Sequence, residues 1–430
     1  MMRLLCAMLI GFAGAAEANG FRLLEGHGGP VHGAAYADGV TATASFDNSV
    51  GLWPDATGEA DWLEGHDAAV KSVIFVDENT IASAGDDRQV IIWDREASAP
   101  VHKLSGHTGP ILGLSASSDG RLVASASWDK RIGIWDVESG ALVRWLEGHT
   151  GLVNDVAFLG AERLISASYD GTIREWRISD GVITRTLARH GFGVNRLLLN
   201  PEGGWLAYGA LDGGTRAISL EDGAEIADLT LDRRPILAMA MRDDGGEIAV
   251  GDGEGYIMVV NTSDWSIARD FRAAKRGPVW ALAYVDDGAS VVAGGIEDAA
   301  YVFPLGASSD QPRMGEAQRA FHTDPKTLEN GERQFLRKCS VCHSLTPDGG
   351  RKAGPTLHRL FGRPAGTVAG YAYSKALDGA DLVWNEDTVD KLFDLGPDHY
   401  TPGSKMPMQR IVKPEDRADL IAYLKRVTAD

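Results

Sequence analysis

The residues best suited to chemistry lie in one short stretch, Cys339-Ser340-Val341-Cys342-His343. Two cysteines three positions apart on a helical turn present their sulfur atoms to the same side. There the sulfurs can form thioether bonds to the two vinyl groups of a haem, and the histidine that follows can reach the iron as an axial ligand. The spacing therefore predicts one covalently bound haem c, attached through Cys339 and Cys342, with His343 as the first axial ligand.

Two other uses of a cysteine pair fit the sequence less well. A structural zinc site needs four donors, and the chain holds one further cysteine, Cys6, far away at its beginning. A redox-active pair of the thioredoxin kind would need an α/β domain of its own, and the surrounding sequence lacks that pattern. Haem attachment remains the interpretation of the motif.

The first eighteen residues have the pattern of an export signal. Arg3 gives a positive start, Leu4 to Ala15 form an apolar run, and Ala16-Glu17-Ala18 is a small-x-small cleavage site. The apolar run is short for a membrane span, and a retained N-terminal anchor is the alternative. We therefore expect residues 1–18 to be a signal peptide and the mature protein to be periplasmic, with no stable membrane span.

Length and charge limit the remaining possibilities. A chain of 430 residues is long for a single core, so two domains are expected. The net charge of −18 argues against nucleic acid as a partner, because binding to phosphates needs a basic surface.

A repeat fills the region between the signal and the cysteine motif. Its clearest copies begin LEGHGGPVHGAAY, LEGHDAAVKSVIF, LSGHTGPILGLSA and LEGHTGLVNDVAF. The first core residues of successive copies are 39 to 43 residues apart, at Val31, Val70, Ile111, Val153, Val194, Ile236 and Val279. Each copy then alternates small and apolar residues up to a turn, as half-buried antiparallel strands do. This period is that of a four-stranded propeller blade.

The Gly-His, Asp and Trp positions of the repeat resemble those of the WD-repeat family. The resemblance implies an all-β, seven-bladed propeller over residues 19–305. The C-terminal region that follows is expected to be a small all-α domain. The resemblance to WD repeats also implies that Phe21 to Leu24 complete the seventh blade, so that no sheet edge stays exposed. WD-repeat propellers are more often platforms that bind proteins than enzymes.

Five histidines recur once per blade and invite interpretation as metal ligands. The repetition favours a structural role instead, because buried polar groups must find partners within the blade. By resemblance to WD repeats, we expect His66 to bond to Asp87 and Trp93 of its own blade. The five are His27, His66, His107, His149 and His190.

The C-terminal region is similar to class I cytochromes c. After a polar linker at 306–326, residues 327–430 carry Gly354-Pro355-Thr356-Leu357, Leu360-Phe361-Gly362-Arg363, the segment GYAYSKA and Pro402-Gly403-Ser404-Lys405-Met406. The resemblance implies that the Pro355 carbonyl orients the imidazole of His343 and that Met406 is the second axial ligand. It also implies that Arg363, Tyr373 and Trp384 contact the haem propionates.

Alternatives exist for the second ligand. Met408 could compete with Met406, and His358 or His399 could give a bis-histidine haem. We expect Met406, because it ends the proline-glycine loop that the family shares. A thioether ligand favours ferrous iron and a comparatively high reduction potential.

Charge divides the chain unevenly. Residues 331–430 hold fifteen basic and thirteen acidic side chains, whereas residues 20–330 hold twenty-six basic and forty-six acidic ones. The basic side chains near the haem motif could form a rim that attracts an acidic redox partner, or could be an ordinary solvated surface. They are Arg337, Lys338, Arg351, Lys352, Lys405, Arg410 and Lys413. The acidic propeller could equally dock onto its own basic haem domain.

Two functions follow as hypotheses. In the first, the protein is an electron carrier, not an enzyme, and its propeller binds a partner protein. In the second, the propeller is an oxidoreductase with a second cofactor, and the haem is its electron port. The electron donor and acceptor remain open in both.

Overall fold

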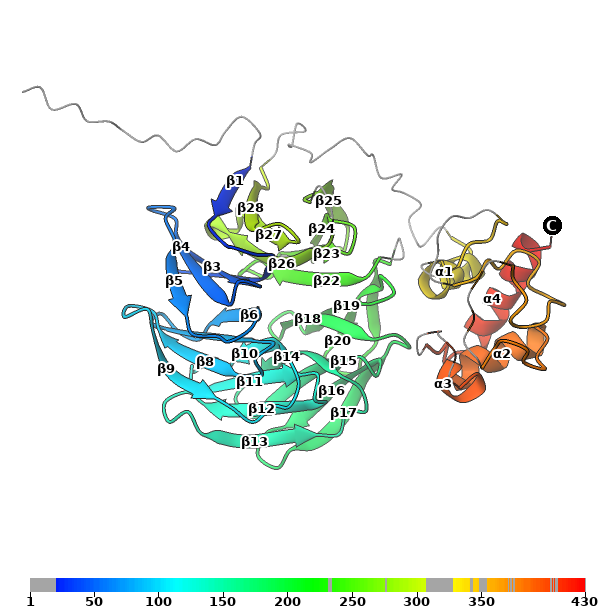
Figure 1. The fold of residues 1–430 in the computed structure, drawn as a ribbon, viewed down its shortest axis with the longest axis horizontal. Helices are drawn as coiled ribbons and strands as arrows, with labels where there is room; N and C mark the ends of the chain where they lie inside the picture. The colour runs from blue at the N-terminus through cyan, green and yellow to red at the C-terminus, as the bar shows by residue number, and fades with distance from the viewer. Residues whose placement is uncertain are drawn as a thin grey trace, which may run out of the picture.

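The computed structural model describes residues 21–230, 234–274, 277–306, 328–340, 343–347, 354–369, 371, 373, 376–402, 404, 406 and 409–429. A large ring of strands and a smaller helical domain make up this part of the chain (Figure 1). The expected signal peptide, residues 1–18, lies outside the described residues, as does the expected linker apart from Gly306.

Twenty-eight strands in the described part of the chain form seven antiparallel sheets of four strands each, the blades of a propeller. The seven-bladed propeller expected from the repeat is therefore confirmed. Blade 1 contains β2 Val31–Ala37, β3 Val40–Ser45, β4 Ser49–Pro54 and β5 Asp61–Glu64. Blade 2 contains β6 Val70–Phe75, β7 Thr80–Gly85, β8 Val90–Asp94 and β9 Ala99–Leu104. Blade 3 contains β10 Ile111–Ala116, β11 Leu122–Ser127, β12 Arg131–Asp136 and β13 Leu142–Glu147.

The other four blades repeat this plan. Blade 4 contains β14 Val153–Leu159, β15 Arg163–Ser168, β16 Thr172–Arg177 and β17 Val182–Arg189. Blade 5 contains β18 Val194–Asn200, β19 Trp205–Ala210, β20 Thr215–Ser219 and β21 Glu225–Asp228. Blade 6 contains β22 Ile236–Met241, β23 Glu247–Asp252, β24 Tyr256–Asn261 and β25 Ile267–Arg272. Blade 7 contains β26 Val279–Val285, the short 3-10 helix η1 Asp286–Gly288, β27 Ser290–Gly295, β28 Ala299–Pro304 and, from the start of the chain, β1 Arg22–Glu25.

The ring closes between the two ends of the propeller. β1 pairs antiparallel with β28, with Arg22 opposite Val302 and Glu25 opposite Ala299. The expectation that Phe21 to Leu24 complete the seventh blade is thus confirmed for Arg22 to Leu24, while Phe21 packs against Phe303. Pairing the two ends leaves no unmatched strand edge at the junction.

The repeat is also visible in the hydrogen bonding. In every blade, the pairing of the innermost strand with its neighbour shifts register directly after the first core residue, as between Val31 and Gly33 in blade 1. Such a bulge increases the local twist of a strand. Its recurrence shows that the seven degenerate sequence copies fold alike.

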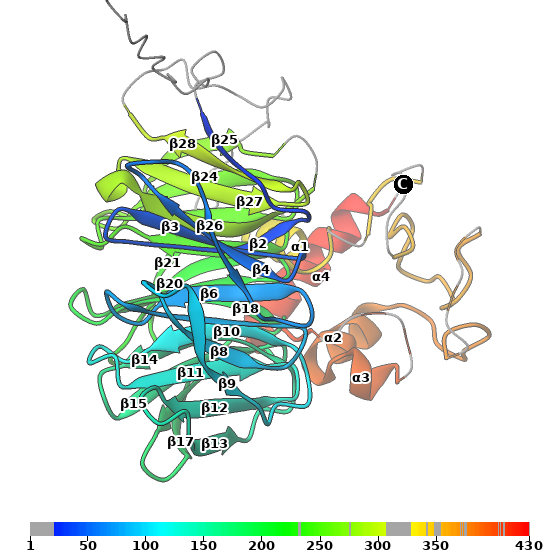
Figure 2. The same cartoon turned by 60° about the vertical axis from the view of Figure 1, so that its left-hand side comes forward.

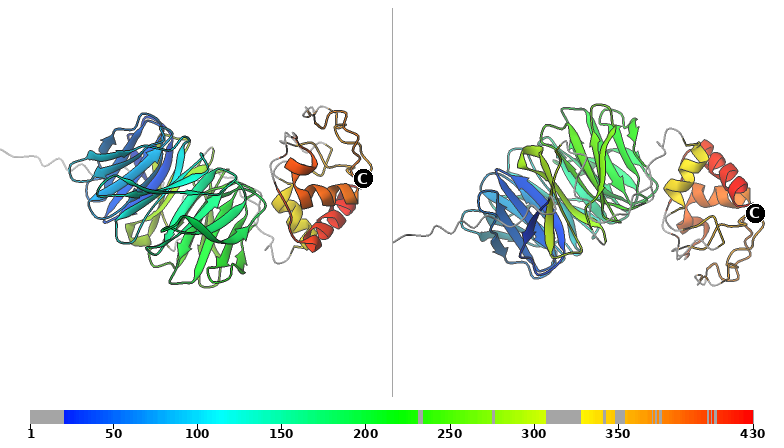
Figure 3. Two further views of the ribbon diagram at one scale, coloured as in Figure 1. Left: turned by 90° about the horizontal axis from the view of Figure 1, so that it is seen from below. Right: turned by 90° about the horizontal axis from the view of Figure 1, so that it is seen from above.

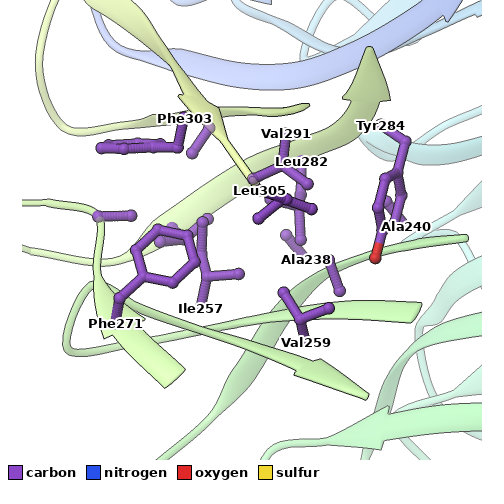
Figure 4. Packing of buried hydrophobic residues seen from close by; sticks show 14 residues of the cluster. Ala238, Ala240, Ile257, Val259, Phe271, Leu282, Tyr284, Val291, Phe303 and Leu305 are labelled. Carbon is purple, nitrogen blue, oxygen red and sulfur yellow. The ribbon is translucent and has the colours of Figure 1, made fainter. Parts of the chain in front are cut away.

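The hydrophobic cores lie between neighbouring blades. Figure 4 shows one of them, where Ile257 and Phe271 of blade 6 face Leu282 and Phe303 of blade 7. Another joins blade 7 to blade 1 through Leu24 and other buried residues. Because each blade buries apolar side chains against both neighbours, no blade has a complete core alone.

A chain of buried hydrogen bonds lies inside blade 3 and has counterparts in blades 1, 2 and 4. Trp135 Nε1–H donates to Ser125 Oγ at 2.8 Å, and Ser125 Oγ lies 2.8 Å from His107 Nε2. His107 Nδ1 lies 2.8 Å from Asp129 Oδ2. Since a carboxylate only accepts, Nδ1 carries the proton, and a neutral ring then accepts from the serine hydroxyl at Nε2. The equivalent sets are Trp53, Thr43, His27 and Asp47; Trp93, Ser83, His66 and Asp87; Trp176, Ser166, His149 and Asp170.

These bonds support the structural role expected for the histidines and correct one detail. His66 does bond to Asp87, but it reaches Trp93 only through Ser83, so the expected direct bond between histidine and tryptophan is wrong. In blade 5 the pattern changes again: His190 Nε2 lies 2.7 Å from Asp212, and Nδ1 lies 3.3 Å from Tyr208. Burial lowers the pKa of His190 to about 4, so its ring is neutral at pH 7.

The helical domain, residues 328–429 as described, contains α1 Asn330–Lys338, α2 Glu386–Leu395, α3 Pro397–Tyr400 and α4 Pro414–Val427. Asn385 and Thr388 form a capping box at the start of α2. α1 packs on α4 at Gly331, where an added Cβ would lie 2.7 Å from Tyr423 Cβ. The glycine therefore permits the close approach of the two helices.

The helical domain lies to one side of the propeller, next to the strands of blades 4 and 5. Figures 1 and 3 show it there from different directions, and Figure 2 again places α1 and α4 outside the ring. Contacts between the two domains involve residues near β15, β18, β19 and β21.

Candidate functional site

A cavity of about 430 Å³ lies in the helical domain, against the propeller. Most of its walls are apolar side chains of the helical domain, and five of its lining residues come from the propeller. The propeller residues are Tyr169, Phe192, Gly193, Leu211 and Asp212.

The structure brings most of the predicted site residues to this cavity. Those that line it are Cys339, His343, Pro355, Arg363, Tyr373, Trp384 and Met406. Cys342, the second predicted attachment point, lies outside the described residues, as does Met408. Site residues up to 67 positions apart in the sequence, from Cys339 to Met406, thus line the same cavity.

The end of α1 positions the cysteine motif. Cys339 follows the last residue of the helix, is 3% exposed, and its N–H donates to Phe335 O at 2.9 Å. The N–H of His343 donates to Cys339 O, also at 2.9 Å. This bond holds the histidine close to the end of α1 and to the attachment cysteine.

A backbone carbonyl holds the imidazole of His343. Its Nδ1 lies 2.6 Å from Pro355 O. A carbonyl only accepts, so Nδ1 carries the proton and Nε2 is the basic nitrogen, the form in which histidine ligates iron. Gly354 lies directly against the ring, and an added Cβ there would be 2.7 Å from Nδ1 and 2.9 Å from Nε2.

Met406 supplies a thioether to the cavity from the loop between α3 and α4. It packs against the apolar cluster that includes Cys339, Leu360 and Phe393. The loop is tied at its start, where Thr401 N–H donates to Pro397 O at 2.9 Å. Among the residues described, neither His358 nor His399 lines the cavity, which favours Met406 over those two as the second ligand.

Arg363, Tyr373 and Trp384 contribute polar groups to the cavity wall. The Arg363 guanidinium donates to His358 O at 2.6 Å and to Thr356 O at 2.8 Å, which fixes its position. Trp384 N–H donates to Arg363 O at 3.0 Å. Burial lowers the pKa of Arg363 and raises that of Tyr373, so both sit in a partly desolvated place that favours a guanidinium cation paired with an anion.

The residues present fit a covalently bound haem. A cysteine sulfur, an imidazole with a fixed tautomer and a thioether face one apolar cavity, and a half-buried guanidinium lines it where a propionate could be held. In the part of the chain that the structure describes, no group of three or more His, Cys, Asp or Glu side chains is arranged to hold a metal ion. The donor set therefore suits a haem better than a bare metal.

The predicted basic rim needs correction. Arg337 and Lys338 are buried, 7% and 6% exposed, and contact the propeller instead of solvent. Arg410 is exposed, as is Lys413. Arg351, Lys352 and Lys405 lie outside the described residues. The alternative that the acidic propeller docks onto its own haem domain agrees with these contacts.

Sequence reasoning missed the propeller's part in the cavity. Tyr169 precedes the turn aspartate of its blade, as Phe46 and Trp128 do in theirs. An aromatic residue at this position belongs to the repeat, so it gave no sign that Tyr169 lines a cavity. No signal in the sequence says which blade meets the helical domain.

No helix in the described part of the chain is both long and apolar enough to cross a membrane.

Comparison with known proteins agrees with the geometry. The family model "Cytochrome c" matches residues 328–428, and the model "WD domain, G-beta repeat" matches residues 60–94, 98–136 and 140–177. Cytochrome c of Chlamydomonas reinhardtii is 51% identical over 102 residues, which are 24% of this chain and 90% of that protein. Cytochromes c of Sesamum indicum and Gossypium barbadense are 46% and 48% identical over 105 residues, each covering 24% of this chain and 94% of the relative. The similarity to these relatives thus concerns the last quarter of the chain and spans nearly all of each relative.

Proposed function

This chain belongs to the cytochrome c family through its C-terminal domain, and on that premise we propose that it is an exported electron carrier with one haem c and His/Met ligation. Cys339 and Cys342 hold the haem covalently, and His343 and Met406 ligate its iron. The observation that carries the proposal is the bond from His343 Nδ1 to Pro355 O in the cavity that Met406 also lines.

Each residue has a definite task in this proposal. When bound, the haem supplies reversible one-electron chemistry at its iron. Pro355 keeps the imidazole in the ligating tautomer, and Met406 would supply the second protein ligand, which would leave the iron no place for a substrate. The apolar walls exclude water, and Arg363 with Tyr373 and Trp384 interacts with the propionates.

The propeller serves as an interaction platform for proteins in this proposal. The repeat histidines are engaged within their blades, and the described residues show no second cluster of metal ligands. These two observations favour the platform over the alternative, a propeller-based oxidoreductase with a second cofactor. The partners would be the proteins that donate and accept the electron.

Periplasmic location is part of the proposal. It is supported by the signal-like residues 1–18 and by the usual attachment of haem c after export. If it is correct, Ala18 is the last residue removed, and the mature chain begins two residues before Phe21.

The visible spectrum of the purified protein tests the proposal. After export in cells that carry the haem attachment machinery, we expect one c-type haem per chain that survives acid extraction. The double variant Cys339→Ala, Cys342→Ala should be colourless while its propeller still folds, as judged by its far-UV spectrum. Colourless wild-type protein would contradict haem attachment, and a second chromophore or metal would favour the oxidoreductase.

A further inference from the structure

Loops at one end of blades 4 and 5 form part of the cavity wall. Tyr169 follows β15, Phe192 and Gly193 precede β18, and Leu211 and Asp212 follow β19. Tyr169 and Leu211 occupy equivalent places in successive blades, before the turn aspartates Asp170 and Asp212. One edge of the site is therefore built by the propeller and is incomplete without it.

The backbones of the two domains meet at Gly191. The N–H of Arg410 donates to Gly191 O at 3.2 Å. Gly191 has φ of +89°, and a Cβ there would collide with Arg410 O and lie 3.1 Å from Lys338 Nζ. Only a residue without a side chain lets the helical domain come this close.

A buried lysine stands at the centre of the contact. Lys338 Nζ donates to His190 O at 2.8 Å, lies 3.6 Å from Asp212 Oδ2 and lies 4.5 Å from the centre of the Phe192 ring. The side chains of Lys338 and Asp212 are 4% and 0% exposed. A buried charge is tolerated only with such partners, so this ion pair specifies one docked arrangement.

A second ion pair flanks the first. Arg337 Nη1 lies 2.9 Å from Asp228 Oδ2, and both side chains are mostly buried. Arg337 and Lys338 directly precede Cys339, so the propeller contacts the helical domain beside the attachment cysteine. Two acidic groups of blade 5 thus match two cations at the edge of the cavity.

We propose that the loops of blades 4 and 5 are a docking surface for the chain's own haem domain, and that they cover the edge of the haem next to Cys339. This inference rests on the proposed haem. An acidic redox partner that approaches this edge competes with Asp212 and Asp228 for the same two cations. Such a partner exchanges electrons here only after it displaces the propeller, whereas small reductants need no such displacement.

Amide hydrogen exchange in the holoprotein tests the docking directly. In the wild type, we expect slow exchange for the peptide that contains the Arg410 N–H and for residues 190–193. Lys338→Glu places a carboxylate against Asp212 and His190 O, so exchange there should become about tenfold faster or more, the least that loss of one buried charged contact implies. The control Lys391→Glu reverses the charge of an exposed lysine on α2 and should exchange like the wild type.

A second variant attacks the contact from the propeller side. Gly191→Ala should also speed exchange at Arg410, because its Cβ collides with that residue. Gly160→Ala is the matched control: Gly160 has φ of +70° and no atom within 4 Å of an added Cβ, so it adds backbone strain without touching the helical domain. This pair keeps the test valid if Lys338→Glu impairs folding near Cys339.

Reduction kinetics complete the test. Stopped-flow reduction by a bulky acidic protein reductant should be roughly tenfold faster in Gly191→Ala than in Gly160→Ala, while reduction by ascorbate should be the same in both. Fast wild-type exchange at Arg410, or exchange unchanged by both variants, would overturn the proposal. A protein without haem would overturn the proposed function instead, and the exchange pattern would still show whether the domains dock.

Discussion

Gly354→Ala is the sharpest test of how the cavity holds its imidazole. The added Cβ would collide with His343 Cε1 and lie 2.7 Å from Nδ1, whereas such non-bonded atoms normally stay about 3.5 Å apart. The ring must therefore retreat by roughly 1 Å. The substitution adds one methyl group and changes no charge, so its effect on the ring is steric.

The retreat works against the bond that fixes the tautomer. His343 Nδ1 lies 2.6 Å from Pro355 O, and a displacement of this size takes the pair to or beyond the limit of a good hydrogen bond, about 3.2 Å. Loss of such a bond costs about 1–3 kcal/mol, which weakens the iron–imidazole bond roughly 5- to 150-fold if His343 is the ligand. A proton competes with iron for Nε2, so the acid transition of the ferric haem should move to higher pH by about 0.7–2 units.

The assay is an acid titration followed by the change from low-spin to high-spin absorption. Gly362→Ala is the control, because Gly362 has φ of +86° and no atom within 4 Å of an added Cβ. This control should lower the free energy of unfolding by about 1–2 kcal/mol through backbone strain and leave the pH of the acid transition unchanged. If Gly354→Ala titrates at the wild-type pH, the reasoning from Pro355 and the ring contact is refuted.

Three further outcomes follow from the structure. Met406→Ala should abolish the weak charge-transfer band of a methionine-ligated ferric haem and lower the reduction potential of the haem. If Met408→Ala abolishes the band instead, Met408 is the ligand. Ser125→Ala leaves a buried indole N–H and imidazole nitrogen without their shared partner, so the free energy of unfolding should fall by about 2–4 kcal/mol in urea denaturation. The exposed Ser118→Ala in the same blade should change it by less than about 0.5 kcal/mol. Burial lowers the pKa of His190 to about 4, so between about pH 6.5 and 4 the unfolded chain binds a proton at this residue that the folded chain does not bind. The free energy of unfolding should therefore fall by up to about 3 kcal/mol over this range. An equal free energy of unfolding at about pH 7 and pH 4.5 would contradict this.

The propeller could be predicted because its information is local and repeated. A Gly-His, a turn aspartate and a strand tryptophan recur in the first four copies, and the apolar residues before the first Gly-His had no blade except the last to join. The serine that links histidine to tryptophan was missed, although a hydroxyl residue stands ten positions before the tryptophan in four blades, as Ser83 does before Trp93. Small residues are common in such strands, so a single serine is a weak signal.

The helical domain was predictable for a similar reason, since Cys339, Pro355 and Met406 each belong to a short motif. The contact between the domains was not. His190 and Lys338 are 148 positions apart, and neither belongs to a pattern that names the other. Composition showed only that an acidic and a basic part share one chain. Which acidic groups meet which basic ones depends on three-dimensional packing that the sequence does not encode locally.

The pairing of β1 with β28 also fixes an order of events during synthesis. β1 is the first strand to be synthesised, and its partner β28 follows about 280 residues later, so the seventh blade is the last to be completed. Until then the ring has an open seam, with unmatched backbone groups on β28 that other chains can engage. The cysteine motif follows this seam in the chain. Every described strand of the ring thus precedes the helical domain in the chain, and a chain cut after residue 305 still holds all of them.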